Sequence, residues 1–221
     1  MDLLPPFPGF TPAGLDFLRD LAANNDRAWF LPRKSVFEDD LRGPLHCLVA
    51  ELASEARARR LPYVGSANLF RIYRDVRFSK DKSPYKTHVS AWMGTSADKD
   101  APGGFYVRVK PGACMVAVGL WQPEKATLGR IRARLAADPD LGDSLTERLA
   151  ARDLVWESDE ALKRMPRGFE SDADSPAAPY LRWKSFLATR ALPDAAMLDR
   201  GLVAHALDVM EAGTAVLDLA R

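Results

Sequence analysis

The sequence predicts a single α+β domain in which an antiparallel sheet of four to five strands is flanked by N- and C-terminal helices. Apolar residues recur three and four apart before residue 62 and after residue 123, whereas residues 68–121 largely alternate with the period of strands. Turn signals such as Pro111-Gly112 separate the strand candidates and favour antiparallel pairing. A chain of 221 residues suits one domain, so we take residues 1–221 as that domain.

The N-terminal third is expected to be helical. Thr11 is a suitable N-cap for a first helix because Pro12 follows it, and Asp26 is a suitable cap for the next turn. A longer apolar period runs over residues 36–56, and Gly43-Pro44 is expected to kink or split that helix.

Four strands are expected in the middle of the chain, over residues 68–78, 87–94, 103–112 and 113–121. In the first of them, Phe70, Ile72, Val76 and Phe78 fall on one face, which we expect to be buried.

The helical period then returns. We expect helices at 123–139, 141–153, 178–192 and 193–219, an edge strand at 154–158, and mostly loop at 162–179.

Composition excludes several classes of function. The net charge of +1 gives no global basic field, and Cys47 and Cys114 lie too far apart in sequence to form a paired motif, so a reducing cytoplasm is the expected compartment. The most apolar run, residues 113–121, is too short to span a membrane, and the N-terminus does not resemble a signal peptide. Neither a phosphate-binding glycine loop nor a Gly-x-Ser-x-Gly elbow is present, and the histidines are isolated. We expect no metal, cofactor or membrane partner.

The polar faces of the four expected strands suggest a ligand site. If the pleats keep register, one face carries Arg71, Tyr73, Asp75, Arg77, His88, Ser90, Trp92, Tyr106, Arg108, Lys110, Ala117, Gly119 and Trp121. Arginine forks and aromatic rings suit an anionic or planar ligand, and the small residues Ala117 and Gly119 would leave room above the sheet. A solvated or helix-covered sheet face would have the same alternation, so both interpretations stay open.

A basic loop follows the first expected strand. Within residues 71–88, six Lys/Arg against two Asp give +4, so the remainder of the chain carries −3. Lys80, Lys82 and Lys86 are candidate anion ligands, and Pro84 stiffens the loop. Asp75 and His88 are candidates for general acid/base chemistry, although a histidine at the start of a strand is often structural.

Three functional hypotheses follow. The first is a protein that binds, and as a further step turns over, an anionic or phosphorylated small molecule, with phosphoester hydrolysis or group transfer as the reaction class. The second is a nucleic-acid-binding module that uses the loop lysines on phosphates and Tyr85 on a base. The third is an interaction scaffold whose loop pairs with acidic groups, such as those after residue 193. The sequence does not give the oligomeric state.

The chain also resembles a known family. The segments "FRIYRDVRFSKDKSPYKTH" (70–88), "GGFYVRVKPG", "GLWQPE" and "LKRMPRGF", with "FLRDLAANNDRAWF" and "FEDDL" before them, are similar in order and spacing to the bacterial and fungal domain of unknown function twenty-four sixty-one. The resemblance covers about residues 10–192. It implies the domain boundaries and no particular activity. It also implies that these positions belong to the family signature: Arg71, Tyr73, Arg74, Asp75, Arg77, Lys80, Lys82, Tyr85, Lys86 and His88.

Overall fold

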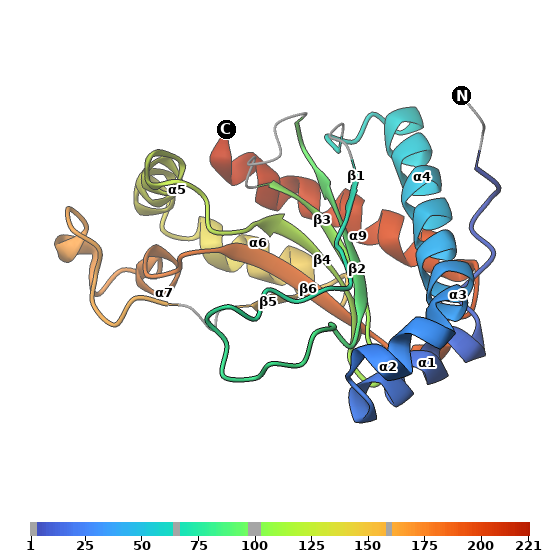
Figure 1. Ribbon diagram of the computed structural model, residues 1–221. Helices are drawn as coiled ribbons and strands as arrows, with labels where there is room; N and C mark the ends of the chain where they lie inside the picture. The colour runs from blue at the N-terminus through green and yellow to red at the C-terminus, as the bar shows by residue number, and fades with distance from the viewer. Residues whose placement is uncertain (1–3, 64–66, 97–102, 158–160) are drawn as a thin grey trace.

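The computed structural model describes residues 4–63, 67–96, 103–157 and 161–221, and it confirms the expected α+β architecture (Figure 1). The described strands form one antiparallel sheet in the order β1-β2-β3-β4-β6-β5, six strands rather than the four or five expected. They are β1 (Ala67–Leu69), β2 (Val89–Gly94), β3 (Gly103–Val109), β4 (Cys114–Leu120), β5 (Val155–Glu157) and β6 (Phe186–Leu192).

Three of the described helices pack on one face of this sheet. α9 (Gly201–Leu217) lies along β4, β3 and β6, α4 (Gly43–Ala58) lies against β1 and β2, and α6 (Leu141–Ala150) lies against β5 (Figure 1). The remaining α-helices are α1 (Pro12–Ala23), α2 (Arg27–Phe30), α3 (Lys34–Phe37), α5 (Lys125–Ala137), α7 (Ala178–Leu181) and α8 (Asp194–Met197). No helix in the described part of the chain is long and apolar enough to cross a membrane.

Both expected N-caps are confirmed. Thr11 Oγ1 accepts a hydrogen bond from the Gly14 N–H at 3.0 Å, and Asp26 Oδ1 accepts one from the Trp29 N–H at 2.9 Å. Each bond satisfies a backbone donor that the first turn of a helix leaves free.

The expected break at Gly43-Pro44 is also present, as a π-helical turn over Glu38–Arg42 that leads into α4. Pro44 has no N–H to donate to the carbonyl four residues back, and the Gly43 N–H bonds instead to Glu38, five residues back. The π turn therefore follows from the position of the proline.

Alternate strand residues form the core beneath the helices. Val107, Val109, Val116 and Val118 are all buried on the helix side of the sheet. Burying a valine or leucine side chain fully contributes about 1.5–3 kcal/mol, so this face supplies much of the driving force for folding. Helix α9 approaches closely because it has no side chain at Gly213, where a Cβ would lie 2.2 Å from Val118 Cγ1.

The helix expected over 178–192 is wrong beyond its first turn. Only α7 is helical, and residues 186–192 form β6, a central strand hydrogen-bonded to β4 on one side and β5 on the other. The segment "FLATRAL" is rich in good helix formers, so its local preference misled the prediction. Pairing with two neighbouring strands overrides that preference.

The strand expected over 68–78 is also wrong for most of its length. Regular pairing stops at Leu69, and the chain continues as an irregular antiparallel arm in which Tyr73 forms an isolated bridge with Tyr85. The Phe70 N–H bonds to the Ser90 carbonyl, and the Lys86 N–H bonds to the Ile72 carbonyl. Between these two bonds one side of the arm covers two residues, from Phe70 to Ile72, and the other covers four, from Ser90 to Lys86. The register therefore shifts, and the predicted alternation fails.

The predicted buried face of this arm changes accordingly. Ile72 is buried, but Phe70 is 47% exposed and Phe78 is 96% exposed. Tyr85 takes the inward place instead and stacks on Phe30, with ring centroids 4.2 Å apart.

The remaining sequence expectations fit the structure. Helices α5 and α6 lie within the expected ranges, and most of 162–179 lacks regular structure. β5 is an edge strand as expected, and Ser158, the last residue of that expected strand, lies outside the described residues. The helix expected over 193–219 is divided into α8 and α9.

Candidate functional site

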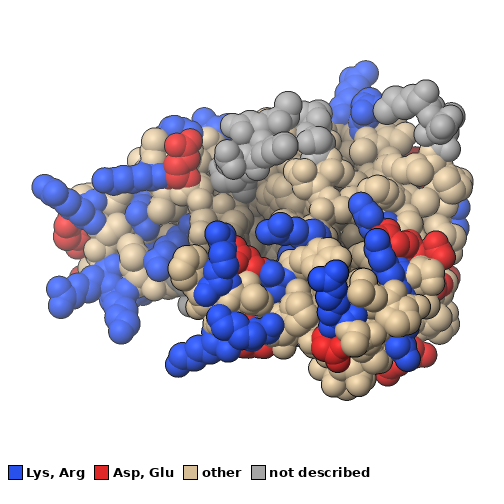
Figure 2. All heavy atoms as spheres, in the orientation of Figure 1, with Lys and Arg blue, Asp and Glu red and all other residues tan. Residues whose placement is uncertain are grey.

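The side of the sheet opposite α4, α6 and α9 carries polar and aromatic residues. The register places Tyr106 between Trp92 and Ala117, and Arg108 between Ser90 and Met115. Trp92, Tyr106, Arg108 and Met115 are all partly exposed. In Figure 2 this side of the molecule is hollowed near its middle, with Lys and Arg side chains around the hollow. Part of the polar face that we expected from the alternation is therefore present on β2 and β3.

Five basic side chains gather at one end of this face, and we call them the basic cluster: Arg71, Lys86, His88, Arg108 and Lys110. His88 and Lys110 stand opposite each other just beyond the paired ends of β2 and β3, because Val89 pairs with Val109. In the described part of the chain no carboxylate forms an ion pair with any member of the cluster. Positive charge is therefore concentrated here, although Asp75, which is bonded to Arg77, also interacts electrostatically with Arg71.

The pKa values in the cluster reflect this concentration. Burial lowers the pKa of His88 to about 4, and the charges of Lys86, Arg108 and Lys110 act in the same direction. Burial also lowers the pKa of Lys86, and neighbouring Arg71 adds to that effect. His88 is therefore neutral at pH 7, and a bound anion would offset the repulsion among the cations around it.

Aromatic rings adjoin the cluster. The rings of Phe70 and Tyr106 meet edge to face with centroids 6.2 Å apart, and Lys86 Nζ lies 5.2 Å from the centre of the Phe70 ring. Phe70 was expected in the core, but it stands opposite Ser90 on the polar side, because the register of β1 with β2 continues to this residue. A planar or apolar part of a ligand would meet these rings next to the cations.

The small residues Ala117 and Gly119 do not leave the open space above the sheet that we expected, and they are small for another reason. Both residues are buried. Gly119 has a φ of +141°, and a Cβ there would lie 2.0 Å from the Phe186 carbonyl oxygen, so glycine is required by the close approach of β6. Across β3, a Cβ on Gly104 would lie 2.5 Å from the Trp92 indole, which covers that part of the face.

Asp75 and His88 are not brought together. The Asp75 carboxylate accepts hydrogen bonds from Arg77 Nη2 at 2.7 Å and Nε at 3.0 Å, and from the Arg77 N–H at 3.2 Å. These bonds to Arg77 hold the pKa of Asp75 below its usual value. Asp75 therefore serves as the partner of Arg77, and none of the described hydrogen bonds joins it to His88.

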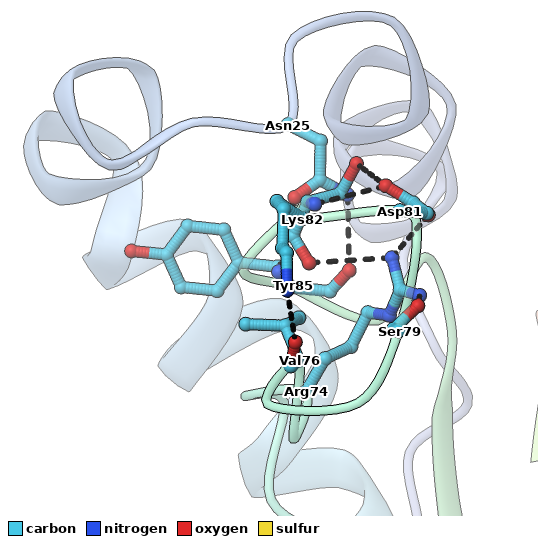
Figure 3. A network of polar contacts seen from close by, with 8 residues as sticks. Asn25, Arg74, Val76, Ser79, Asp81, Lys82 and Tyr85 are labelled. Carbon is cyan, nitrogen blue, oxygen red and sulfur yellow. Dashed lines mark hydrogen bonds and ion pairs between the residues drawn. The ribbon is translucent and has the colours of Figure 1, made fainter.

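The loop beyond Arg74 is held by its own side chains (Figure 3). Arg74 Nη1 donates to Asp81 and to the Ser83 carbonyl, and Asp81 Oδ1 accepts from the Ser83 N–H at 2.9 Å. Lys82 Nζ donates to the Val76 carbonyl at 2.9 Å. Several of the loop's charges are thus used to shape the loop.

The other expected ligand residues lie apart from the cluster. Lys80 is exposed and has no hydrogen bond or ion pair to any residue that the structure describes. Trp121 is 48% exposed and follows Met115, the partner of Arg108, by six residues, which is about 20 Å along a strand. Tyr73 is 49% exposed and lines a pocket beside α2 and α3.

Two residues that sequence reasoning missed now belong to the site region. Asn25 hydrogen-bonds the backbone of Tyr85 and so fixes the base of the loop. Nothing local in the sequence indicates that role, since the two residues are sixty positions apart. Phe70 was visible as the neighbour of Arg71, but the assumed strand parity assigned it to the core.

The family comparison agrees with the sequence motifs. The family described as conserved hypothetical protein (DUF2461) matches residues 13–218. The chain belongs to this family. The match extends past residue 192, where we had expected the family-like region to end, and includes α9 of this DUF2461 protein. No curated protein and no solved structure matches the chain.

The described residues of this DUF2461 protein include no group of three or more His, Cys, Asp or Glu placed to hold a metal ion. Cys47 and Cys114 are both buried free thiols. What distinguishes the polar side of the sheet is the basic cluster with its adjoining rings.

Proposed function

We propose that this protein binds an anionic small molecule, phosphorylated or carboxylated, on the polar side of the sheet and in the cytoplasm. The observation that carries the proposal is the basic cluster. Lys86, Arg108 and Lys110 act on a neutral His88, Arg71 acts on Lys86, and no described carboxylate forms an ion pair with these cations. Like charges placed together raise the free energy of the empty site, and an anion lowers it.

The neighbouring rings favour a ligand with a planar group. Tyr106 lies two residues from Arg108 on the same side of β3, and Phe70 packs against it. A phosphate or carboxylate bound by Arg108 and Lys110 would leave an attached ring within reach of Tyr106 and Phe70. A phosphate ester that carries an aromatic ring elsewhere in the molecule, such as a nucleotide, meets both requirements.

His88 supplies the only proton-transfer group that we assign to this ligand. His88 is neutral at pH 7, and a bound anion would raise its pKa from about 4 towards the range in which an imidazole acts as a general base. If the bound ligand is turned over, phosphoester hydrolysis or group transfer is the reaction class that we propose, with His88 as base and Arg108 as the cation facing the anion.

The test is a calorimetric titration with inorganic pyrophosphate, AMP and adenosine. We expect AMP and pyrophosphate to bind and adenosine to bind at least tenfold more weakly, because a charge-assisted hydrogen bond contributes about 1.5–3 kcal/mol. Lys86→Gln should raise the Kd for AMP at least tenfold. The matched control is Lys80→Gln, which removes the same charge from an exposed site outside the cluster and should change the Kd less than twofold.

Equal losses in both variants, or no saturable binding of either anion, would overturn the proposal. The nucleic-acid alternative predicts a different pattern, with affinity for single-stranded DNA falling steeply with salt and Lys80→Gln weakening it as much as Lys86→Gln. One observation favours the nucleic-acid alternative: Phe78 is exposed in the basic loop, where its ring could stack on a base. Tyr85, which we had expected to stack a base, is 3% exposed.

The scaffold hypothesis included a version in which the basic loop pairs with acids after residue 193 of the same chain, and the described ion pairs do not support it. Three of the acids after residue 193 pair with arginines outside the basic loop: Asp194 with Arg19, Asp208 with Arg152 and Arg190, and Glu211 with Arg59. Within the described residues, Arg74 and Arg77 pair instead with the loop's own Asp81 and Asp75.

A further inference from the structure

The pocket that Tyr73 lines lies between the arm and the N-terminal helices. It has a volume of about 270 Å³ and is bounded by α2, α3, the π turn, the start of α4 and residues 69–73. At about 30 Å³ for each water in the liquid, this volume equals that of about nine water molecules. The pocket therefore suits a small ligand.

The inner wall of the pocket is apolar. Phe30, Phe37, Leu45, Ile72 and Val89 line it, and each of them is less than 8% exposed and belongs to the main core. A ligand resting on this wall would remove apolar surface from water and meet no buried polar group there.

The mouth of the pocket carries an excess of positive charge. Lys34, Arg42 and Arg71 stand against one acid, Glu38. Arg42 Nη1 binds Glu38 Oε2 at 3.0 Å, so these two charges offset each other. Lys34 and Arg71 have no ion pair in the part of the chain that the structure describes.

Two exposed aromatic residues complete the mouth. Phe70 and Tyr73 line the pocket and remain about half exposed. They are not part of the buried core. An apolar wall, two half-exposed rings and two unpaired cations form an amphipathic site.

We infer that this pocket binds a small amphipathic carboxylate, with its chain or ring on the wall of Phe30, Phe37 and Leu45 and its carboxylate at Lys34 and Arg71. Charge complementarity selects an acid, because the mouth retains two positive charges. The wall selects an aliphatic or aryl tail, and the volume of about 270 Å³ limits that tail to a short one. The pocket adjoins the anion site proposed above, since Phe70 and Arg71 border both, but the inference does not rest on that site.

The test is a titration of the intact protein with straight-chain carboxylates from butanoate to dodecanoate, followed by NMR of the Leu45, Ile72 and Val89 methyl groups. We expect affinity to rise about fourfold with each added methylene and to level off near octanoate, where the wall is covered. 1-Octanol, which lacks the carboxylate, should bind at least tenfold more weakly than octanoate.

Lys34→Glu reverses one charge at the mouth and should weaken octanoate binding at least tenfold. Lys80→Glu makes the same change at an exposed position outside the pocket and should alter the Kd less than twofold. AMP binding by Lys34→Glu should stay within twofold of the parent protein, which separates this pocket from the basic cluster. The inference is overturned if octanoate does not shift these methyl signals, if octanol binds as tightly as octanoate, or if both lysine variants weaken binding equally.

Discussion

The side-chain amide of Asn25 binds the backbone of Tyr85 in both directions. Asn25 Nδ2 donates to the Tyr85 carbonyl at 3.0 Å, and Asn25 Oδ1 accepts from the Tyr85 N–H at 3.0 Å. The Tyr85 ring meanwhile stacks on Phe30, five residues after Asn25. The short segment from Asn25 to Phe30, the last residue of α2, thus fixes both the backbone and the ring at the base of the basic loop.

Replacing Asn25 by alanine should lower the free energy of unfolding by about 1–3 kcal/mol, because a partly buried donor and acceptor lose their partner. Urea denaturation measures this change. Asn24→Ala is the control, since its exposed side chain donates only to the Asp20 carbonyl and its loss should cost less than about 1 kcal/mol. Equal effects of the two substitutions would show that the Tyr85 contact does not stabilise the fold.

Acid should destabilise the protein through His88. Its pKa is about 4 in the folded state and near 6.5 when unfolded, so the unfolded chain binds the proton more tightly between these values. Stability due to neutral His88 is therefore present above pH 6.5 and is lost as the pH falls towards 4. The full shift corresponds to about 3 kcal/mol, and solvent screening of this partly exposed side chain reduces it to about 1–2 kcal/mol.

Urea denaturation between pH 4 and 7 measures this loss of stability. His88→Gln should flatten the pH dependence of the free energy of unfolding, and the exposed control His205→Gln should leave it unchanged. Phosphate added to the parent protein should raise the His88 pKa in an NMR titration, since an anion offsets the charges of Lys86, Arg108 and Lys110. A His88 signal unmoved by phosphate would place the anion elsewhere.

Two helical glycines should respond oppositely to alanine. A Cβ on Gly213 would lie 2.2 Å from Val118 Cγ1, so Gly213→Ala should overpack the junction of α9 and β4 and cost about 1–3 kcal/mol. Nothing lies within 4 Å of a Cβ on Gly129 in α5, so Gly129→Ala should stabilise by about 0.5–1 kcal/mol. Thermal unfolding of both variants tests the packing of α9, and a neutral Gly213→Ala would contradict it.

Asp81 should control the order of the basic loop. Hydrogen bonds from the Ser83 side chain and N–H, and from Arg74, hold the pKa of the Asp81 carboxyl well below its usual range. Asp81→Ala should therefore speed amide exchange at Ser83 while leaving exchange in β3 unchanged. Because the pKa is lowered on folding, these contacts persist above pH 3.8 and weaken as the pH falls below it. Unchanged exchange at Ser83 would mean that the loop is held mainly by Asn25.

The sequence was sufficient where local rules and the final fold agree. The caps at Thr11 and Asp26, the break at Pro44 and strands β2 to β4 follow from short-range signals, and all of them are present. Strand β6 could not be predicted in this way, since its residues favour a helix and only its two neighbouring strands determine its conformation.

The candidate site was predictable only in part. Alternation correctly placed Tyr106, Arg108 and Lys110 together on one side of β3. It could not show that Asp75 would bind Arg77, or that the arm would become irregular between Phe70, on the polar side, and Ile72, in the core. Both depend on the irregular arm, where the period of two no longer applies.

The position of β6 also affects how the chain reaches its final form. During synthesis β1 to β4 are complete by residue 120, but the free edge of β4 has no partner until residues 186–192 emerge. For some seventy residues of elongation a hydrophobic strand is exposed to self-association. Nascent or truncated chains ending before β6 should therefore depend on chaperones far more than the full-length protein does.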